Sequence, residues 1–157
     1  MANTMRWRYG DTSPVILPVD ASTVIEIGDM VYLEIDDARP ASAQADQGTE
    51  AANQQLFHSK FAGVAMQASP SGDSTPIRVA TTGVFEFDIL STTLEVGDLM
   101  GSDENAGGTA LLNQTVAKVT TANASIGRCA KRLNPAGTRV LFDVVSTVTL
   151  GGPQVPA

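Results

Sequence analysis

Residues that commonly carry enzyme chemistry are scarce in this chain. Its 157 residues include one cysteine, Cys129, and one histidine, His58. These counts exclude an internal disulfide framework and the metal sites that need several cysteines or histidines. A hydrolase could pair His58 with a serine, but no residue that would orient the imidazole is visible, so we expect an exposed histidine. Cys129 is expected to be a small, buried strand residue rather than a reactive thiol.

Carboxylates form two groups that could bind a metal. Glu34, Asp36 and Asp37 follow one predicted strand, and a second group begins at Asp103 and Glu104. Oxygen ligands of this kind suit Ca²⁺ or Mg²⁺, yet neither group has the spacing of a calcium-binding loop. Phosphate-binding loops, dinucleotide fingerprints and nucleophile elbows are also absent from the sequence. We therefore predict no enzymatic activity, no metal site and no cofactor, and expect solvated acids.

Charge and hydropathy narrow the range of partners. Ten basic residues against seventeen acidic ones give a net charge of −7, which opposes broad contact with nucleic acid or an anionic membrane. No apolar run suits a signal peptide or a membrane helix, so we expect the protein to be made and kept inside the cell, or in a particle assembled there. With 43% apolar and 17% charged residues, the chain has the composition of a globular protein.

The charges are unevenly distributed along the chain. Residues 11–37 contain seven acidic residues and no basic one, and residues 118–139 contain five basic residues and no acidic one. Two such surfaces attract one another, either within one molecule or between copies. The candidates for a subunit interface are Arg128, Lys131, Arg132 and Arg139.

The first twenty residues differ from the rest, and we call residues 1–20 the arm. Arg6, Trp7, Arg8 and Tyr9 are followed by two prolines around an apolar triplet. Proline fixes its backbone and lacks an amide donor, so the arm suits an extended conformation. Trp, Tyr and Arg are common interface anchors, and twenty extended residues reach on the order of 60 Å. We expect an arm that contacts a protein partner and is dispensable for folding; a disordered terminus is the alternative.

A repeat organises the remainder. The segments 22–30 and 91–99 share five identities in nine positions, including a Gly-Asp pair, and a weaker match relates Phe61–Ala65 to residues 125–129. Alternating apolar residues before each Gly-Asp predict a strand, a tight turn and a second strand. Cys129 then occupies the position of Ala65. These matches indicate two related halves.

The predicted fold is mainly β: a compact barrel-like or sandwich-like domain over residues 21–150, with a tail at 151–157. One short helix is expected within 40–58, capped by Thr49 or Asp46 and carrying Ala52, Leu56 and Phe57 on one face. In the strand at 83–89, alternation places Phe85, Phe87 and Ile89 toward the core. The strands are expected at about 23–27, 30–35, 61–67, 76–80, 83–89, 94–100, 115–120, 125–132 and 138–149.

The repeated motifs resemble a known family. The segments 24–32, 61–65, 80–87, 94–99 and 126–131 resemble tailed-bacteriophage capsid decoration proteins, also called cement or head-stabilising proteins. The resemblance covers about residues 22 to 147. It implies a small, often trimeric, β-rich virion protein that sits on the outer capsid surface and clamps neighbouring major capsid proteins, and it carries over no catalytic residue.

The resemblance also implies a role for the arm, since members commonly pair a terminal arm with capsid strands. We expect Arg6, Trp7, Arg8 and Tyr9 to be the capsid-binding anchors. The alternative is a carbohydrate- or receptor-binding β-module on the phage surface. That function needs exposed aromatic residues outside the arm, for which Tyr32 is the candidate.

Overall fold

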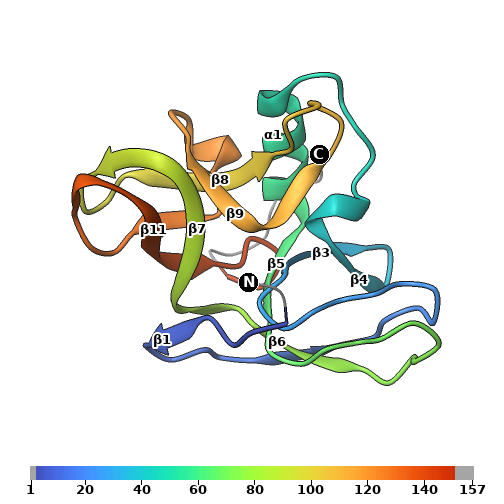
Figure 1. The fold of residues 1–157 in the computed structure, drawn as a ribbon. Helices are drawn as coiled ribbons and strands as arrows, with labels where there is room; N and C mark the ends of the chain where they lie inside the picture. Colours follow the sequence, from blue (N-terminus) through green and yellow to red (C-terminus); the bar gives the residue numbers. More distant parts are fainter. Residues whose placement is uncertain (1–2, 151–157) are drawn as a thin grey trace.

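The computed structural model describes residues 3–150 of the chain, so the predicted tail at 151–157 lies outside the described residues. The fold is mainly β with a single α-helix among the described residues, as predicted (Figure 1). Two short 3₁₀ turns lie at Ala41–Ala43 and Ala122–Ala124. The other elements are β1 (Trp7–Tyr9), β2 (Val15–Leu17), β3 (Met30–Glu34), β4 (Asp37–Pro40), α1 (Glu50–Lys60), β5 (Phe61–Ala65), β6 (Ile77–Ala80), β7 (Thr82–Leu94), β8 (Leu99–Glu104), β9 (Leu111–Lys118), β10 (Gly127–Cys129) and β11 (Leu133–Val145).

Five strands close into a barrel. Their order is β7-β11-β10-β8-β9, and β9 returns to pair in parallel with β7 through Asp88–Thr115 and Ile89–Val116. The remaining strand of this sheet, β1, does not belong to the barrel. It pairs antiparallel with β7 and is the end strand of the sheet. Closure removes the exposed edges that an open sheet of five strands would present.

The other five strands form a smaller sheet, which we call the small sheet. Its order is β2-β6-β5-β3-β4. One hydrogen bond links its two ends, from the Ala38 N–H in β4 to the Pro18 carbonyl just after β2, at 2.9 Å. The barrel has the same strand order. If the strands of the small sheet, β2 to β6, are renamed β7 to β11 in chain order, the order of the small sheet becomes that of the barrel. The predicted two related halves are therefore present as two five-stranded sheets of the same connectivity.

The two Gly-Asp turns have the same hydrogen bonds. In the first, the Gly28 N–H donates to the Ala65 carbonyl at 2.9 Å, and the Ala65 N–H donates to the Asp29 carbonyl at 2.9 Å. The Asp29 carboxylate accepts from the Glu26 N–H at 2.9 Å. Gly28 has a φ of +97°, a conformation that favours glycine.

The second turn docks onto β10 in the same way. Gly97, with a φ of +93°, donates to the Cys129 carbonyl at 2.9 Å, and the Cys129 N–H donates to the Asp98 carbonyl at 2.8 Å. The Asp98 carboxylate accepts from the Glu95 N–H at 2.9 Å. The predicted equivalence of Ala65 and Cys129 is confirmed.

Both Gly-Asp turns nevertheless differ from the predicted hairpins. The strand predicted at 23–27 is wrong, because this segment makes only an isolated bridge between Ile25 and Ser69. The strand predicted at 94–100 is also wrong in its bounds, because it crosses the second turn. The strands before and after that turn, β7 and β8, are not neighbours in the barrel. Each turn bonds to a strand of its own sheet contributed later in the chain.

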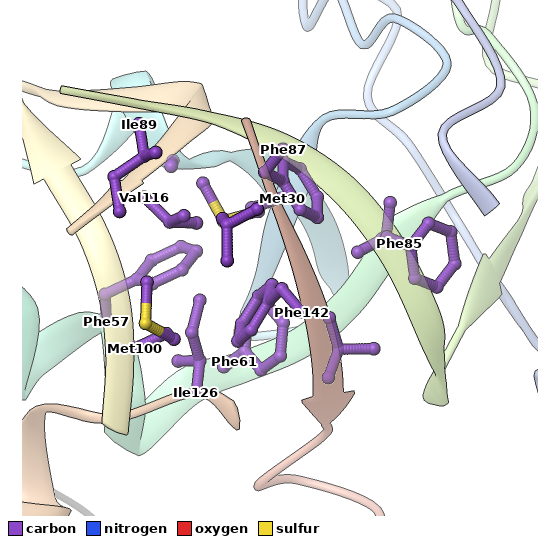
Figure 2. Packing of buried hydrophobic residues seen from close by; sticks show 14 of the residues in the cluster. Met30, Phe57, Phe61, Phe85, Phe87, Ile89, Met100, Val116, Ile126 and Phe142 are labelled. Atoms are coloured by element: carbon purple, nitrogen blue, oxygen red, sulfur yellow. The ribbon is translucent and has the colours of Figure 1, made fainter. Parts of the chain in front are cut away.

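The main core fills the barrel and the space beside α1. It contains the predicted Phe85, Phe87 and Ile89, all buried. Figure 2 shows the side chains of Phe57 and Phe142 pointing into the same interior. The small sheet has a separate core without aromatic residues, made of Val19, Ile25, Val31, Ala38, Ala62, Ala65, Ile77 and Val79.

The helix begins and packs mostly as the sequence predicts. Thr49 is the N-cap, and its hydroxyl accepts from the Ala52 N–H at 3.2 Å. Phe57 is fully buried, but the other buried positions of α1 are the amides Asn53 and Gln54. Gln54 donates to the Ser102 carbonyl at 2.9 Å, so a side-chain amide satisfies a backbone group of β8.

Candidate binding surface of the arm

The arm belongs to both sheets. Its first strand, β1, pairs with β7 of the barrel, and β2 pairs with β6 of the small sheet. Between them, the Thr81 N–H donates to the Thr12 carbonyl at 2.9 Å. The extended conformation is as predicted. The expectation that the arm is dispensable for folding stays a prediction, and the pairing of both arm strands with the sheets weighs against it. Removing it would expose one side of β7 and one side of β6 and remove the closing bond at Pro18.

Arg6 lies inside the protein rather than on a binding surface. Its guanidinium donates to the Gln114 side chain at 2.8 Å and to the Glu86 carbonyl at 3.0 Å. It also lies 5.7 Å from the centre of the Phe87 ring and 3.4 Å from the Asp88 carboxylate. Arg6 therefore fixes β1 against the barrel.

Gln114 extends this network to the small sheet. Its side-chain amide donates to the Asp29 carboxylate at 2.8 Å. Asp29 is buried, and the loss of hydration raises the pKa of its carboxyl group despite the stabilising hydrogen bonds from Glu26 and Gln114. The chain Arg6–Gln114–Asp29 thus ties the arm, the barrel and the first turn together.

Trp7 and Tyr9 are the arm anchors that remain accessible. Their side chains are 41% and 51% exposed, and the Trp7 indole donates to the Gly10 carbonyl at 2.9 Å, which orients the ring. Arg8 is exposed but forms an ion pair with Glu86 at 3.2 Å. The four predicted anchors therefore divide into one buried structural residue, Arg6, one surface ion pair, and two exposed aromatic residues.

The backbone of β1 is the second accessible feature of this surface. Because β1 is an end strand, only one of its sides is paired, and the Arg6 carbonyl accepts from the Glu86 N–H on that side at 2.9 Å. Backbone groups of successive strand residues point to opposite sides. Those of Trp7 are therefore directed toward the outer edge, next to the two exposed rings, where the exposed Arg8 guanidinium donates to the Trp7 carbonyl at 3.3 Å.

The predicted interface cations lie in two places. Three of them line a groove of about 400 Å³ beside the start of β11, together with apolar residues that include Leu133 and Pro135. These three cations, Lys131, Arg132 and Arg139, form the rim of what we call the basic groove. Arg128 lies apart in a second pocket with His58 and Asp143, and its guanidinium donates to the Gly97 carbonyl at 2.8 Å.

Most of these cations already have partners in the same chain. Arg132 lies 3.0 Å from Glu95, and Arg139 lies 3.4 Å from Glu86. Among the described residues, no ion pair involves Lys131. These acidic partners lie outside residues 11–37, so no ion pair among the described residues joins the acidic segment to the basic one.

The catalytic candidates do not assemble into a site. His58 is half-buried rather than exposed, and its Nδ1 lies 2.5 Å from the Ser125 carbonyl oxygen. The Ser125 hydroxyl donates to the Gly127 carbonyl instead of the imidazole. Cys129 is buried as predicted, and burial raises the pKa of its thiol. Within residues 3–150, no group of three or more His, Cys, Asp or Glu side chains has an arrangement that could hold a metal ion.

Tyr32 does not provide the aromatic surface expected for carbohydrate binding. It is buried and packs edge-on against Phe57, with the ring centres 6.0 Å apart. Among the described residues, the exposed aromatic side chains are Trp7 and Tyr9, both in the arm. The alternative of a glycan-binding module therefore loses the residue on which it depended.

Sequence reasoning did not identify two residues that matter for these surfaces. Gln114 links Arg6 to Asp29, and a lone glutamine in a strand gives no signal of such a role. Ile35 lies at the tip between β3 and β4, is 95% exposed and has a φ of +56°. An isoleucine inside the acidic run Glu34–Asp37 was a signal that could have drawn attention to this tip.

Comparison with known proteins gives no match: no family model, curated protein or solved structure matches this chain. Over the described part of the chain, none of the helical segments has the length and apolar character needed to cross a membrane.

Proposed function

We propose that this chain is a structural protein of a tailed-bacteriophage virion, without enzymatic activity. It would be made in the host cytoplasm, bind the outer surface of the assembled capsid and bridge neighbouring major capsid proteins. A second partner would be the chain itself, as a homotrimer. The observation that carries the proposal is the free edge of β1 with the exposed Trp7 and Tyr9 beside it.

An end strand with exposed aromatic residues suits the addition of a partner strand. Backbone hydrogen bonds along the edge supply affinity, and side chains at alternate positions supply specificity. Here the edge is held in place by the buried Arg6, so little conformational entropy is lost when the partner binds. Trp7 and Tyr9 would insert into apolar depressions of the capsid surface, as aromatic residues commonly do in protein interfaces.

This mode of binding also explains how a small protein could stabilise a shell. A ligand that binds the assembled lattice better than free subunits shifts the equilibrium toward the lattice. Several copies held together would engage several capsid proteins at once, which raises the overall affinity without any strong single contact.

The test is co-sedimentation of the purified chain with empty, expanded capsids of its parent particle. Replacing both Trp7 and Tyr9 by Ala should lower the affinity about tenfold or more, because two interface anchors are removed. Deleting the arm is unsuitable because β1 and β2 belong to the sheets. The matched control is Leu90→Ala, which also removes an exposed apolar side chain from the barrel sheet. Undiminished capsid occupancy of the double variant, with an unchanged melting temperature, would sink the proposal.

A further inference from the structure

We propose that copies of this chain associate head to tail, with the tip of the β3–β4 hairpin of one copy seated in the basic groove of the next. The tip is residues 34–37, and the basic groove is the one rimmed by Lys131, Arg132 and Arg139. This contact requires no capsid. The inference rests on the proposed function in one respect: it names the surfaces through which the copies of the proposed homotrimer would contact one another.

The first observation is the exposed isoleucine at the tip. Glu34 pairs with Asp37, so Ile35 and Asp36 form a two-residue connection. Such connections favour Asn and Gly, because their backbone requires positive φ. A β-branched residue at φ +56° is sterically unfavourable, and Ile35 is also almost fully exposed to water. Neither feature stabilises the isolated molecule, so both indicate a side chain that contacts a partner.

The second observation is the charge around this isoleucine. Glu34 already contacts Arg39 at 3.2 Å and Lys60 at 3.9 Å. Among the described residues, no ion pair involves Asp36 or Asp37. The tip therefore offers an apolar side chain with two uncompensated carboxylates beside it, and its partner should combine an apolar floor with a basic rim.

The basic groove has this combination, and the one carboxylate that lines it, Glu86, is paired with Arg8 and Arg139. Leu133, Pro135 and Leu141 contribute its apolar surface, and its volume of about 400 Å³ exceeds that of one isoleucine side chain. Lys131 has no ion-pair partner among the described residues. The ion pairs of Arg132 and Arg139 are exposed, and surface pairs of this kind contribute little, so exchanging partners is inexpensive.

The two surfaces cannot meet within one molecule. In Figure 1 the chain turns from β10 into β11 on the left of the view, whereas β3 and β4 lie on the right. A tip on one side and a groove on the other give a heterologous contact, in which each copy uses one surface as donor and the other as acceptor. Repetition of such a contact produces a ring if the rotation closes.

Sedimentation equilibrium of the capsid-free chain tests the contact. The wild type should self-associate at low salt and dissociate in about 1 M NaCl, where the Debye length is about 3 Å. Ile35→Gly should weaken association about tenfold or more, by loss of the buried side chain. The same substitution should leave the melting temperature unchanged or raise it, because glycine accepts positive φ. Ile16→Ser, which alters an exposed isoleucine of β2, should associate as the wild type does.

Charge reversal tests the pairing directly. Asp36→Lys and Lys131→Glu should each reduce self-association, and the variant that carries both changes should regain it, because every copy then has a lysine tip and a glutamate groove. A wild type that stays monomeric at low salt, an Ile35→Gly variant that associates normally, or a double charge variant that stays monomeric would each overturn the proposal. Capsid binding is tested with Trp7 and Tyr9 variants, so either proposal can fail alone.

Discussion

The barrel and the small sheet share one connectivity but differ in strand length and side-chain size. Two barrel strands, β7 and β11, have 13 residues each, and the barrel core contains Phe87 and Phe142. The small sheet has strands of three to five residues around valine, isoleucine and alanine. One closes through a parallel strand pair and the other through a single hydrogen bond. The connectivity thus tolerates large changes in core volume, provided that the docking of each Gly-Asp turn is kept.

The largest expected effect concerns two glycines at equivalent positions of the strands that receive the turns, where each strand lies close to its neighbour in the sheet. A Cβ on Gly63 would lie 1.9 Å from the Ala80 carbonyl oxygen, and one on Gly127 would lie 2.2 Å from the Asp143 carbonyl oxygen. Gly63→Ala and Gly127→Ala should each lower the free energy of unfolding by more than about 3 kcal/mol, because backbone would have to move. Denaturant titration measures this.

The control is Gly97→Ala, where a Cβ meets no atom within 4 Å and only the positive φ is unfavourable. It should cost about 1 kcal/mol. If Gly63→Ala were as mild as this control, the close approach of strands would not be a requirement shared by the two sheets.

A smaller effect is expected where the two sheets are tied together. Arg6→Ala should lower the free energy of unfolding by about 2 kcal/mol, because the Gln114 side chain and the Glu86 carbonyl would lose a buried donor. Arg8→Ala, which removes only an exposed ion pair, should cost about 0.5 kcal/mol or less. Chemical denaturation of both variants measures the difference, and equal losses would contradict the structural role of Arg6.

The smallest expected effect is a difference between the two turn aspartates in how each makes stability depend on pH. The pKa of Asp29 is raised by burial, whereas the pKa of Asp98 is lowered by its hydrogen bond from Glu95 and by Lys118, whose ammonium lies 3.2 Å away. Above the ordinary value of 3.8, the native state holds the proton of Asp29 more tightly than the unfolded state, so Asp29 makes stability fall as pH rises through that window. Below that value, the unfolded state holds the proton of Asp98 more tightly, so Asp98 makes stability rise with pH.

Melting temperatures of Asp29→Asn and Asp98→Asn from about pH 2.5 to about pH 6.5 should reveal these opposite contributions. As pH rises, the melting temperature of the wild type should fall relative to that of Asp29→Asn. It should rise relative to that of Asp98→Asn. Differences of the same sign would mean that the two turns have the same electrostatic environment.

The local sequence was enough to predict the repeat, the helix cap and the buried face of β7. Gly28 and Gly97, the Thr49 cap and the alternation around Phe87 each depend on neighbouring residues. The strand predicted at 23–27 failed because alternation of side chains does not reveal whether a partner strand is present. One of the four predicted arm anchors is buried for a related reason: Arg6 and Arg8 look alike in sequence, and only tertiary contacts bury the first.

The network around Arg6 has a consequence for biosynthesis. Arg6 is translated long before its partners, because Gln114 and Glu86 follow it by 108 and 80 positions. The β1 strand therefore stays unpaired until β7 has been translated, and the contact of Arg6 with Gln114 must wait for β9. Closing loops of this size carries an entropic cost that is recovered only after the barrel strands are in place. The β1 strand is thus held in position by contacts that can form only after β7 and β9 exist.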